Sequence, residues 1–155
     1  MAGENNKVDI FVLDNKPELE YVSMLRQAGY SVELARDLSD ATKKRICACK
    51  ANVFIFSYMF SQAVSISKED GSCSGVIIDT GIDIAETIRL WERDETAKKK
   101  YIHIVSSCAA QEKPPFSKLT WKEWMQKGTI DSYSTRDADS FRLHLQSIED
   151  ALRQN

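Results

Sequence analysis

Five polar residues of this chain follow short apolar runs, at positions where a side chain could take part in chemistry. They are Asp14, Asn15, Ser57, Ser106 and Thr135. A carboxylate such as that of Asp14 can help to hold a hard cation. A serine hydroxyl is neutral at pH 7 and becomes a nucleophile only when a base lies beside it. Whether these side chains meet depends on the elements that precede them.

Five runs predict strands, because they are short and rich in β-branched or aromatic residues. They cover residues 8–13, 31–35, 52–56, 101–105 and 129–134. The third run is the most apolar and should be central, whereas the second alternates in polarity as an edge strand does. Apolar residues elsewhere recur with the 3.6-residue period of amphipathic helices. This period predicts helices over 18–28, 38–50, 82 towards 100, 121–127 and 138–153.

The alternation of strands and helices predicts an α/β fold, in which a five-stranded parallel sheet lies between two helical layers. The size fits a flavodoxin-like, three-layer α-β-α arrangement with strand order 2-1-3-4-5. In that topology the functional crevice lies at the carboxyl ends of strands one and three, where the order reverses. Asp14, Asn15 and Ser57 follow these two strands. Ser106 and Thr135 follow strands four and five, so all five polar residues are expected at one edge of the sheet.

The length of 155 residues is typical of one domain, and we expect a single domain over 1–155. Residues 1–7 are polar and are expected to be flexible. Residues 61–78 are expected to form an inserted loop between the third strand and the third helix, with a short extra strand at 76–78. A loop of this length in a compact domain often has a function of its own.

Composition argues against several classes of function. The net charge is −2, whereas a nucleic-acid module usually has a strong basic excess. No apolar run approaches the roughly 20 residues that span a bilayer, and residues 1–7 lack the apolar centre of a secretory signal. We therefore expect a cytoplasmic protein. The four cysteines have no zinc or redox spacing, and no GxGxxG or P-loop motif is present, so no cofactor is expected.

Four stretches of the sequence share a further pattern. They are an acidic turn after the first strand (LDNKPE, 13–18), the first helix end with the second strand (LRQAGYSVELARD, 25–37), the start of the third helix (GIDIAETIR, 81–89) and the approach to the fifth strand (KGTIDSY, 127–133). With them the chain resembles the receiver domain of two-component response regulators over nearly its whole length. The resemblance implies the same flavodoxin-like fold.

A working receiver holds a divalent cation with two acidic residues after strand one and is phosphorylated on an aspartate that ends strand three. A Ser or Thr after strand four and a Lys after strand five hold the phosphoryl group. On these positions the resemblance places Asp14, Asn15, Ser57, Ser106 and Thr135. Only Asp14 and Ser106 match the family pattern. Ser57 stands in place of the nucleophile, and Thr135 in place of the lysine.

These departures imply a degenerate receiver, or pseudo-receiver, that is not an enzyme. Asn15 and Ser57 remove carboxylates from the cation cage, which leaves Asp14 as a weak metal candidate, and no metal is expected. Loss of the lysine removes a charge that stabilises the transferring phosphoryl group. We therefore expect a non-catalytic signalling module of a two-component or related pathway, which is not phosphorylated on the usual aspartate. Its expected partner is a protein, such as a histidine kinase or another signalling domain.

Three alternatives stay open at the level of the sequence. A displaced acceptor, Asp14 or Asp79, would make the chain an atypical receiver that is phosphorylated or switched by a ligand. Asp70 or Asp79, in the inserted segment, would build a metal or phosphate site if that segment folded back over the crevice. A flavodoxin-like enzyme or small-ligand binder would use Ser57 and Ser106.

Two other patterns have structural explanations. The run Asp79-Thr80-Gly81 matches a short signature of aspartic proteases, but the helix predicted after it favours a capping role for Asp79 or Thr80. His103 in an apolar strand and His144 on the last helix have no catalytic partner at a suitable spacing. Both are expected to be structural.

Two tryptophans define a possible partner surface. Trp121 and Trp124 are three residues apart and so share one face of a helix. They either pack onto the sheet or, together with Tyr133, anchor a partner. In receivers the face formed by helix 4, strand 5 and helix 5 commonly binds partners or a second copy, and a homodimer through this face is the corresponding expectation.

Overall fold

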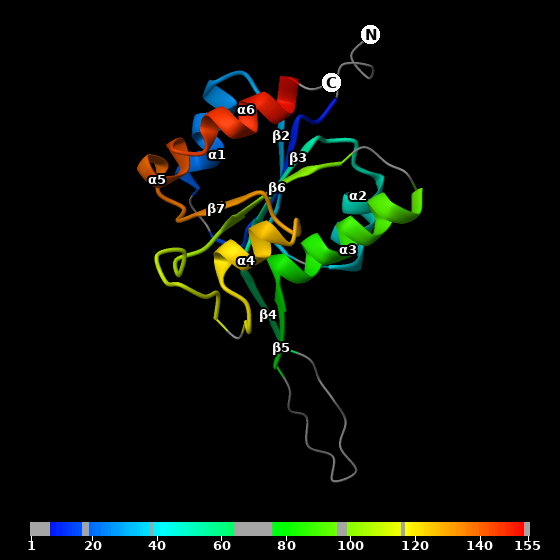
Figure 1. Ribbon diagram of the computed structural model, residues 1–155. Coiled ribbons are helices and arrows are strands. Elements are labelled where there is room, and N and C mark those ends of the chain that lie inside the picture. The colour runs from blue at the N-terminus through cyan, green and yellow to red at the C-terminus, as the bar shows by residue number, and fades with distance from the viewer. Residues whose placement is uncertain are drawn as a thin grey trace.

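A sheet of five parallel strands forms the centre of the molecule (Figure 1). The computed structural model describes residues 7–16, 19–37, 39–63, 76–95, 99–115 and 117–153. The strands are β1 (Ile10–Leu13), β2 (Val32–Ala35), β3 (Val53–Ser57), β6 (Tyr101–Val105) and β7 (Ser132–Ser134). They lie in the order β2-β1-β3-β6-β7, which confirms the predicted order 2-1-3-4-5.

Helices cover both faces of this sheet (Figure 1). One layer consists of α1 (Glu20–Gln27), α5 (Ala138–Arg142) and α6 (Leu145–Arg153). The other consists of α2 (Asp40–Ala48), α3 (Gly81–Glu95) and α4 (Trp121–Gln126). The three-layer α/β arrangement predicted from the sequence is therefore confirmed. No helix in the described ranges is long and apolar enough to cross a membrane.

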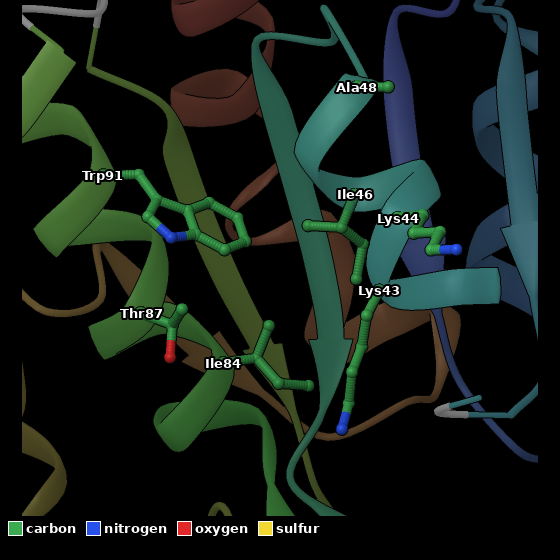
Figure 2. A pocket seen from close by; sticks show the side chains of 7 residues that line it. All are labelled: Lys43, Lys44, Ile46, Ala48, Ile84, Thr87 and Trp91. Atoms are coloured by element: carbon green, nitrogen blue, oxygen red, sulfur yellow. The ribbon is translucent and has the colours of Figure 1, made fainter. Parts of the chain in front are cut away.

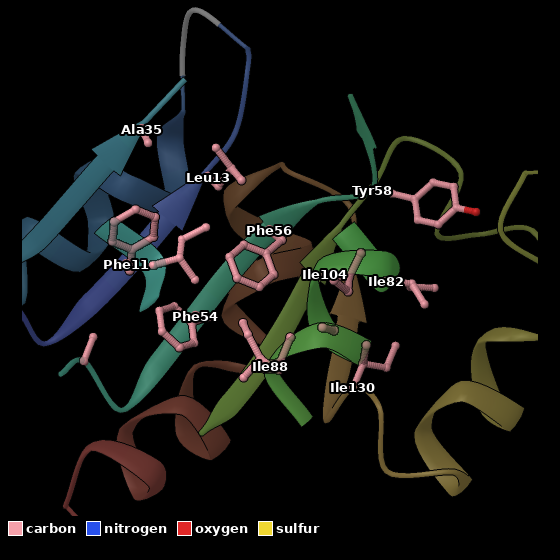
Figure 3. Packing of buried hydrophobic residues seen from close by; sticks show 14 of the residues in the cluster. Phe11, Leu13, Ala35, Phe54, Phe56, Tyr58, Ile82, Ile88, Ile104 and Ile130 are labelled. Carbon is pink, nitrogen blue, oxygen red and sulfur yellow. The ribbon is translucent and has the colours of Figure 1, made fainter. Parts of the chain in front are cut away.

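Two apolar cores form because successive side chains of a strand point to opposite faces of the sheet. On β3, Val53 and Ile55 pack with α1, α5 and α6, whereas Phe54 and Phe56 pack with α2, α3 and α4. Figure 3 shows the second of these cores, in which Ile82 and Ile88 of α3 belong to the same cluster as Phe54, Phe56 and Ile104 of the sheet. β3 is buried along its whole length, as predicted for the central strand.

The third helix begins with a reciprocal pair of hydrogen bonds. The backbone N–H of Asp83 donates to Thr80 Oγ1 at 3.2 Å, and the N–H of Thr80 donates to Asp83 Oδ2 at 3.1 Å. Such a pair satisfies two backbone donors that a helix start leaves free. Thr80 is therefore a helix cap, as the sequence favoured, and the residues that follow it are helical.

The inserted segment differs from the predicted loop at both of its ends. Residues of β4 (Met59–Ala63) and β5 (Val76–Thr80) form a two-stranded antiparallel hairpin, with Met59 opposite Thr80 and Ala63 opposite Val76. Figure 1 shows this hairpin projecting away from the main sheet. The extra strand expected at 76–78 is present, but its partner is β4. Residues 64–75, with Asp70, lie outside the described residues, as do residues 1–6 of the expected flexible N-terminus.

The predicted last helix is broken in two. Between α5 and α6, the N–H of Leu143 donates to Ser140 O and the N–H of His144 donates to Phe141 O. These bonds span three residues rather than the four of an α-helix, so the turn is locally tighter. On either side of it, Phe141 and Ile148 are both fully buried against the sheet.

Gly81 joins the hairpin to α3 at a point of close backbone approach. Its N–H donates to the carbonyl oxygen of Tyr58 at 2.7 Å. A Cβ at this position would overlap the carbonyl oxygen of Ser57 and would lie 3.1 Å from Cβ of Phe56. The overlapping atom belongs to the backbone of the central strand, so it cannot move aside as the end of a flexible side chain can.

We expect Gly81→Ala to destabilise the fold by about 1–3 kcal/mol, because the added methyl group overpacks the end of β3. Urea unfolding at equilibrium would measure this loss. Thr87→Ala, at an exposed position of the same helix, is the control and should change the free energy of unfolding by less than about 0.5 kcal/mol. Equal effects of the two variants would contradict the close approach.

Candidate functional site

The carboxyl ends of the parallel strands bring polar side chains together at the switch in strand order. Asp14, Ser57 and Ser106 follow or end β1, β3 and β6, and all three are buried. Asn15 is exposed and Thr135 is partly exposed. The predicted crevice residues therefore share one edge of the sheet, but only three of the five lie inside it.

Asp14 is the buried charge of this pocket, with no exposed surface at all. Its Oδ2 accepts a hydrogen bond from Tyr21 Oη of α1 at 2.8 Å, and its Oδ1 accepts one from the backbone N–H of Lys16 at 3.2 Å. Burial raises the pKa of Tyr21 well above its ordinary value, and the neighbouring Asp14 carboxylate adds to this effect. Tyr21 therefore stays protonated and remains a donor to Asp14.

Arg136 closes the pocket from the far end of the chain. Its Nε donates to Asp14 Oδ2 at 2.9 Å, and its Nη2 donates to Ser57 Oγ at 2.5 Å. One guanidinium thus bridges the ends of β1 and β3, with the planar geometry that suits a carboxylate and a neighbouring hydroxyl. The residues that bond the pocket together are Asp14, Tyr21, Ser57 and Arg136, which we call the closed pocket.

The pocket holds a cation that the sequence analysis did not predict. Thr135 stands in place of the family's lysine, and its hydroxyl donates to the Asp137 carboxylate. The cation comes instead from Arg136, one position later in the chain. The signal that could have revealed it is a long basic side chain directly after the last strand, opposite a buried acid. The contact with Tyr21 was likewise missed.

Ser106 forms its hydrogen bonds in the turn that follows β6. Its Oγ accepts a hydrogen bond from the N–H of Cys108 at 3.0 Å, and its N–H donates to the carbonyl oxygen of Ser134 at 2.9 Å. These bonds hold the turn after β6 against the end of β7. Ser106 is thus positioned at the pocket edge as predicted, with its hydroxyl engaged within the turn.

The donor set of the closed pocket does not suit Mg²⁺, which binds mainly to carboxylates and water in near-octahedral geometry. Asp14 supplies the only carboxylate of the closed pocket, and a guanidinium and a phenol already bond to it. The second acidic position is the exposed amide of Asn15. The third is the hydroxyl of Ser57, which accepts from Arg136. A divalent cation would have to displace the arginine from a buried ion pair.

No model of a protein family matches the chain, and no curated protein matches it either. Several solved structures, by contrast, match the chain. The N-terminal domain of a response regulator/sensory box/GGDEF protein from Carboxydothermus hydrogenoformans matches with a TM-score of 0.59 at 14% identity, over 93% of both chains. Response regulator TrrA from Thermotoga maritima, solved with Mg²⁺ and BeF, matches with 0.55 at 15% identity, over 92% of this chain and 96% of that one. Chemotaxis protein CheY4 from Vibrio cholerae matches with 0.55 at 18% identity, over 92% and 98%.

The chain has the receiver fold. The coverage shows that the likeness extends over nearly the whole chain, as the four sequence stretches implied. At identities of 14–18% the likeness establishes the arrangement of strands and helices. The chemistry of the pocket has to be argued from this chain's own residues.

The tryptophans of α4 do not share one environment. Trp121 is 1% exposed, stacks on Tyr133 with ring centroids 4.9 Å apart and meets Tyr58 edge-on at 5.5 Å. It belongs to the core and cannot anchor a partner, because the receiver fold encloses it. Trp124 is partly buried, with Nε1 donating to Ser117 Oγ at 3.0 Å, and Tyr133 is also partly exposed. These two residues remain the candidate partner surface.

His103 is a structural residue, as expected. Its ring nitrogens lie 2.6 Å from Ser132 Oγ and 2.8 Å from Ser134 Oγ, on the neighbouring strand. Burial, with a smaller contribution from His144, lowers the pKa of His103 to about 3. The ring is therefore neutral at physiological pH and bonded on both sides. The side chain of Asp79 lies outside the described part of the structure.

We expect Arg136→Gln to lower the free energy of unfolding by about 2–4 kcal/mol, because it leaves the buried Asp14 without a counter-charge. Arg142→Gln is the matched control, since Arg142 pairs with Asp139 in an exposed contact at 3.5 Å and should matter by less than about 0.5 kcal/mol. Urea unfolding measures both. In the Asp14→Asn/Arg136→Gln double variant the losses should be clearly less than additive, and strict additivity would argue against the ion pair.

The pKa of His103 makes the fold sensitive to acid. The unfolded chain protonates this residue near pH 6.5 and the folded chain only near pH 3. Stability from the neutral ring is present above pH 6.5 and is lost as the pH falls towards 3, by up to about 1.4 kcal/mol per pH unit. Unfolding measured between pH 7.5 and 5 should show a shallower pH slope in His103→Asn than in wild type. Identical slopes would contradict the neutral, buried ring.

Proposed function

We propose that this chain is a non-enzymatic, receiver-like signalling module of a two-component or related pathway, which acts through protein contacts and is not phosphorylated at the end of β3. The observation that supports this most directly is the side chain of Ser57. It occupies the end of the central strand and accepts a hydrogen bond from Arg136, which also pairs with Asp14.

Phosphotransfer to a receiver needs an ionised carboxylate as nucleophile beside a bound cation. Ser57 offers a neutral hydroxyl, whose oxygen faces a cationic donor rather than a base. A guanidinium cannot accept the hydroxyl proton, because it stays protonated. The neighbouring carboxylate, Asp14, has both oxygens in hydrogen bonds. The closed pocket therefore lacks both a nucleophile and a free site for the cation.

A module without this chemistry signals through its surface. Partners of this kind are other proteins, such as a histidine kinase or another signalling domain. A homodimer through α4, β7 and α5 is a further part of the proposal. Two apolar side chains are exposed on these elements, Met125 on α4 and Leu143 directly after α5, and a second copy would cover them in such a dimer.

Acetyl phosphate and beryllofluoride, each with Mg²⁺, test the proposal directly. Intact-mass spectrometry should detect no phosphoryl addition, and amide NMR spectra should show no beryllofluoride-dependent shifts around Ser57. The reason is that a guanidinium-bound hydroxyl replaces the required carboxylate. TrrA from Thermotoga maritima, which was solved with Mg²⁺ and BeF, is the positive control in the same reagents.

A phosphoryl group on Asp14 or Asp79 would establish the atypical receiver instead and would overturn the proposal. The same holds for Mg²⁺-dependent beryllofluoride shifts that disappear in Asp14→Asn.

A further inference from the structure

A hollow between α2 and α3 lies on the face of the sheet opposite α1, away from the closed pocket. It has a volume of about 460 Å³, and the described side chains that line it include no carboxylate. Ile46, Ile84 and Trp91 give it an apolar floor and wall, and Lys43, Lys44 and Thr87 lie at its rim. We call this feature the α2–α3 groove.

One face of α3 forms a wall of the groove. Ile84, Thr87 and Trp91 are spaced i, i+3 and i+7, which places them on the same side of the helix. Ile84 and Trp91 pack against the core at their bases but are only partly buried. Figure 2 shows the indole ring of Trp91 directed towards Ile46 of α2 across the groove. An aromatic side chain of this size, left open between two helices, is typical of an anchor site for a partner.

The opposite wall is positively charged. Lys43 and Lys44 of α2 are both exposed, and neither forms an ion pair with any side chain that the structure describes. The next residue, Arg45, is by contrast paired with Glu33 at 2.7 Å. The two lysines therefore form a local cationic rim on a chain whose net charge is −2. Charge complementarity selects an acidic occupant for such a rim.

We propose that the α2–α3 groove binds an acidic amphipathic helix of a partner protein. Apolar side chains of that helix would cover Trp91 and Ile84, and its carboxylates would pair with Lys43 and Lys44. A groove between two helices accepts a third helix by the same packing that joins helices within a domain. The inference deepens the proposed signalling function by naming the contact surface and the chemistry of the partner.

The recessed shape favours a helix over a lipid surface. A peripheral membrane site presents apolar side chains that protrude into the bilayer boundary, whereas Ile46 at the base of the groove is only 4% exposed. A protruding ridge, such as one face of a helix, is the shape that reaches it.

The test uses a fluorescein-labelled synthetic peptide of about 18 residues, long enough to form a helix when bound. It has Leu at i, i+3 and i+7 and Glu on the flanking positions. A matched peptide has Lys in place of each Glu. In fluorescence anisotropy the acidic peptide should bind at least about tenfold more tightly than the basic one, and amide NMR shifts should concentrate in α2 and α3.

Variants of the groove should weaken binding of the acidic peptide. Trp91→Ala removes the apolar anchor, and Lys43→Glu/Lys44→Glu reverses the rim charge; each should cost at least about tenfold in affinity. Thr87→Glu places a repelling charge at an exposed helix position without touching the core, so it tests the groove even if Trp91→Ala fails to fold. Lys122→Glu, at an exposed position outside the groove, is the control and should bind as wild type does.

Three results would overturn the inference. They are equal binding of the two peptides, binding that the groove variants leave unchanged, and Trp91-dependent binding of phosphatidylserine vesicles or of the small apolar dye ANS without peptide binding. Phosphorylation at the pocket would instead overturn the proposed closed pocket while leaving peptide binding intact, so the two proposals fail separately.

Discussion

A fully buried carboxylate needs a counter-charge, and in this molecule that need organises the site. An unpaired ion of this kind costs several kcal/mol when it leaves water. Asp14 obtains its partner from Arg136, which lies 122 residues further along the chain. The pair joins the end of the first strand of the sheet to the segment after its last strand. The same guanidinium reaches Ser57, so three strand ends depend on one side chain.

The ion pair also occupies the groups with which a receiver pocket would bind a cation. A receiver's acid must be free to coordinate a cation and then to support transfer of a phosphoryl group. Here Asp14 accepts bonds from α1, from its own turn and from Arg136. When the chain's own groups satisfy every hydrogen bond of such a carboxylate, the pocket is held together but leaves no open position for a ligand. The bonds that close the site therefore occupy the same groups that a receiver uses as its switch, which is the basis of the function proposed above.

The sequence predicted those parts of this site that depend on local patterns. Strand order and the shared sheet edge of Asp14 and Ser57 follow from apolar periodicity and from the rule that places crevices at the carboxyl ends of parallel strands. The role of Arg136 does not follow, because it depends on the reach of a long side chain across the sheet. Thr135, the residue expected there, points its hydroxyl to Asp137 instead.

Two other differences between the sequence predictions and the structure also depend on contacts between segments that are distant in the chain. Trp121 and Trp124 are close in sequence on one short helix, but Trp121 lies in the core against Tyr133 while Trp124 is only partly buried. The strand Met59–Ala63 lacks a clear signal of its own because it depends on pairing with Val76–Thr80. A short two-stranded ribbon derives its order from its partner strand, so it is difficult to identify in either strand alone.

The closed pocket and the α2–α3 groove are joined mechanically by one helix. α3 begins at Gly81, whose N–H bonds to Tyr58 directly after β3, and no Cβ fits between Gly81 and the carbonyl of Ser57. The same helix presents Ile84 and Trp91 to the groove one and three turns later. The start of α3 is packed closely against the end of β3. A partner bound in the groove would therefore contact a helix that cannot shift without moving the end of β3. Under the proposed function, this contact offers a route between an outer surface and the pocket that does not require a bound cation.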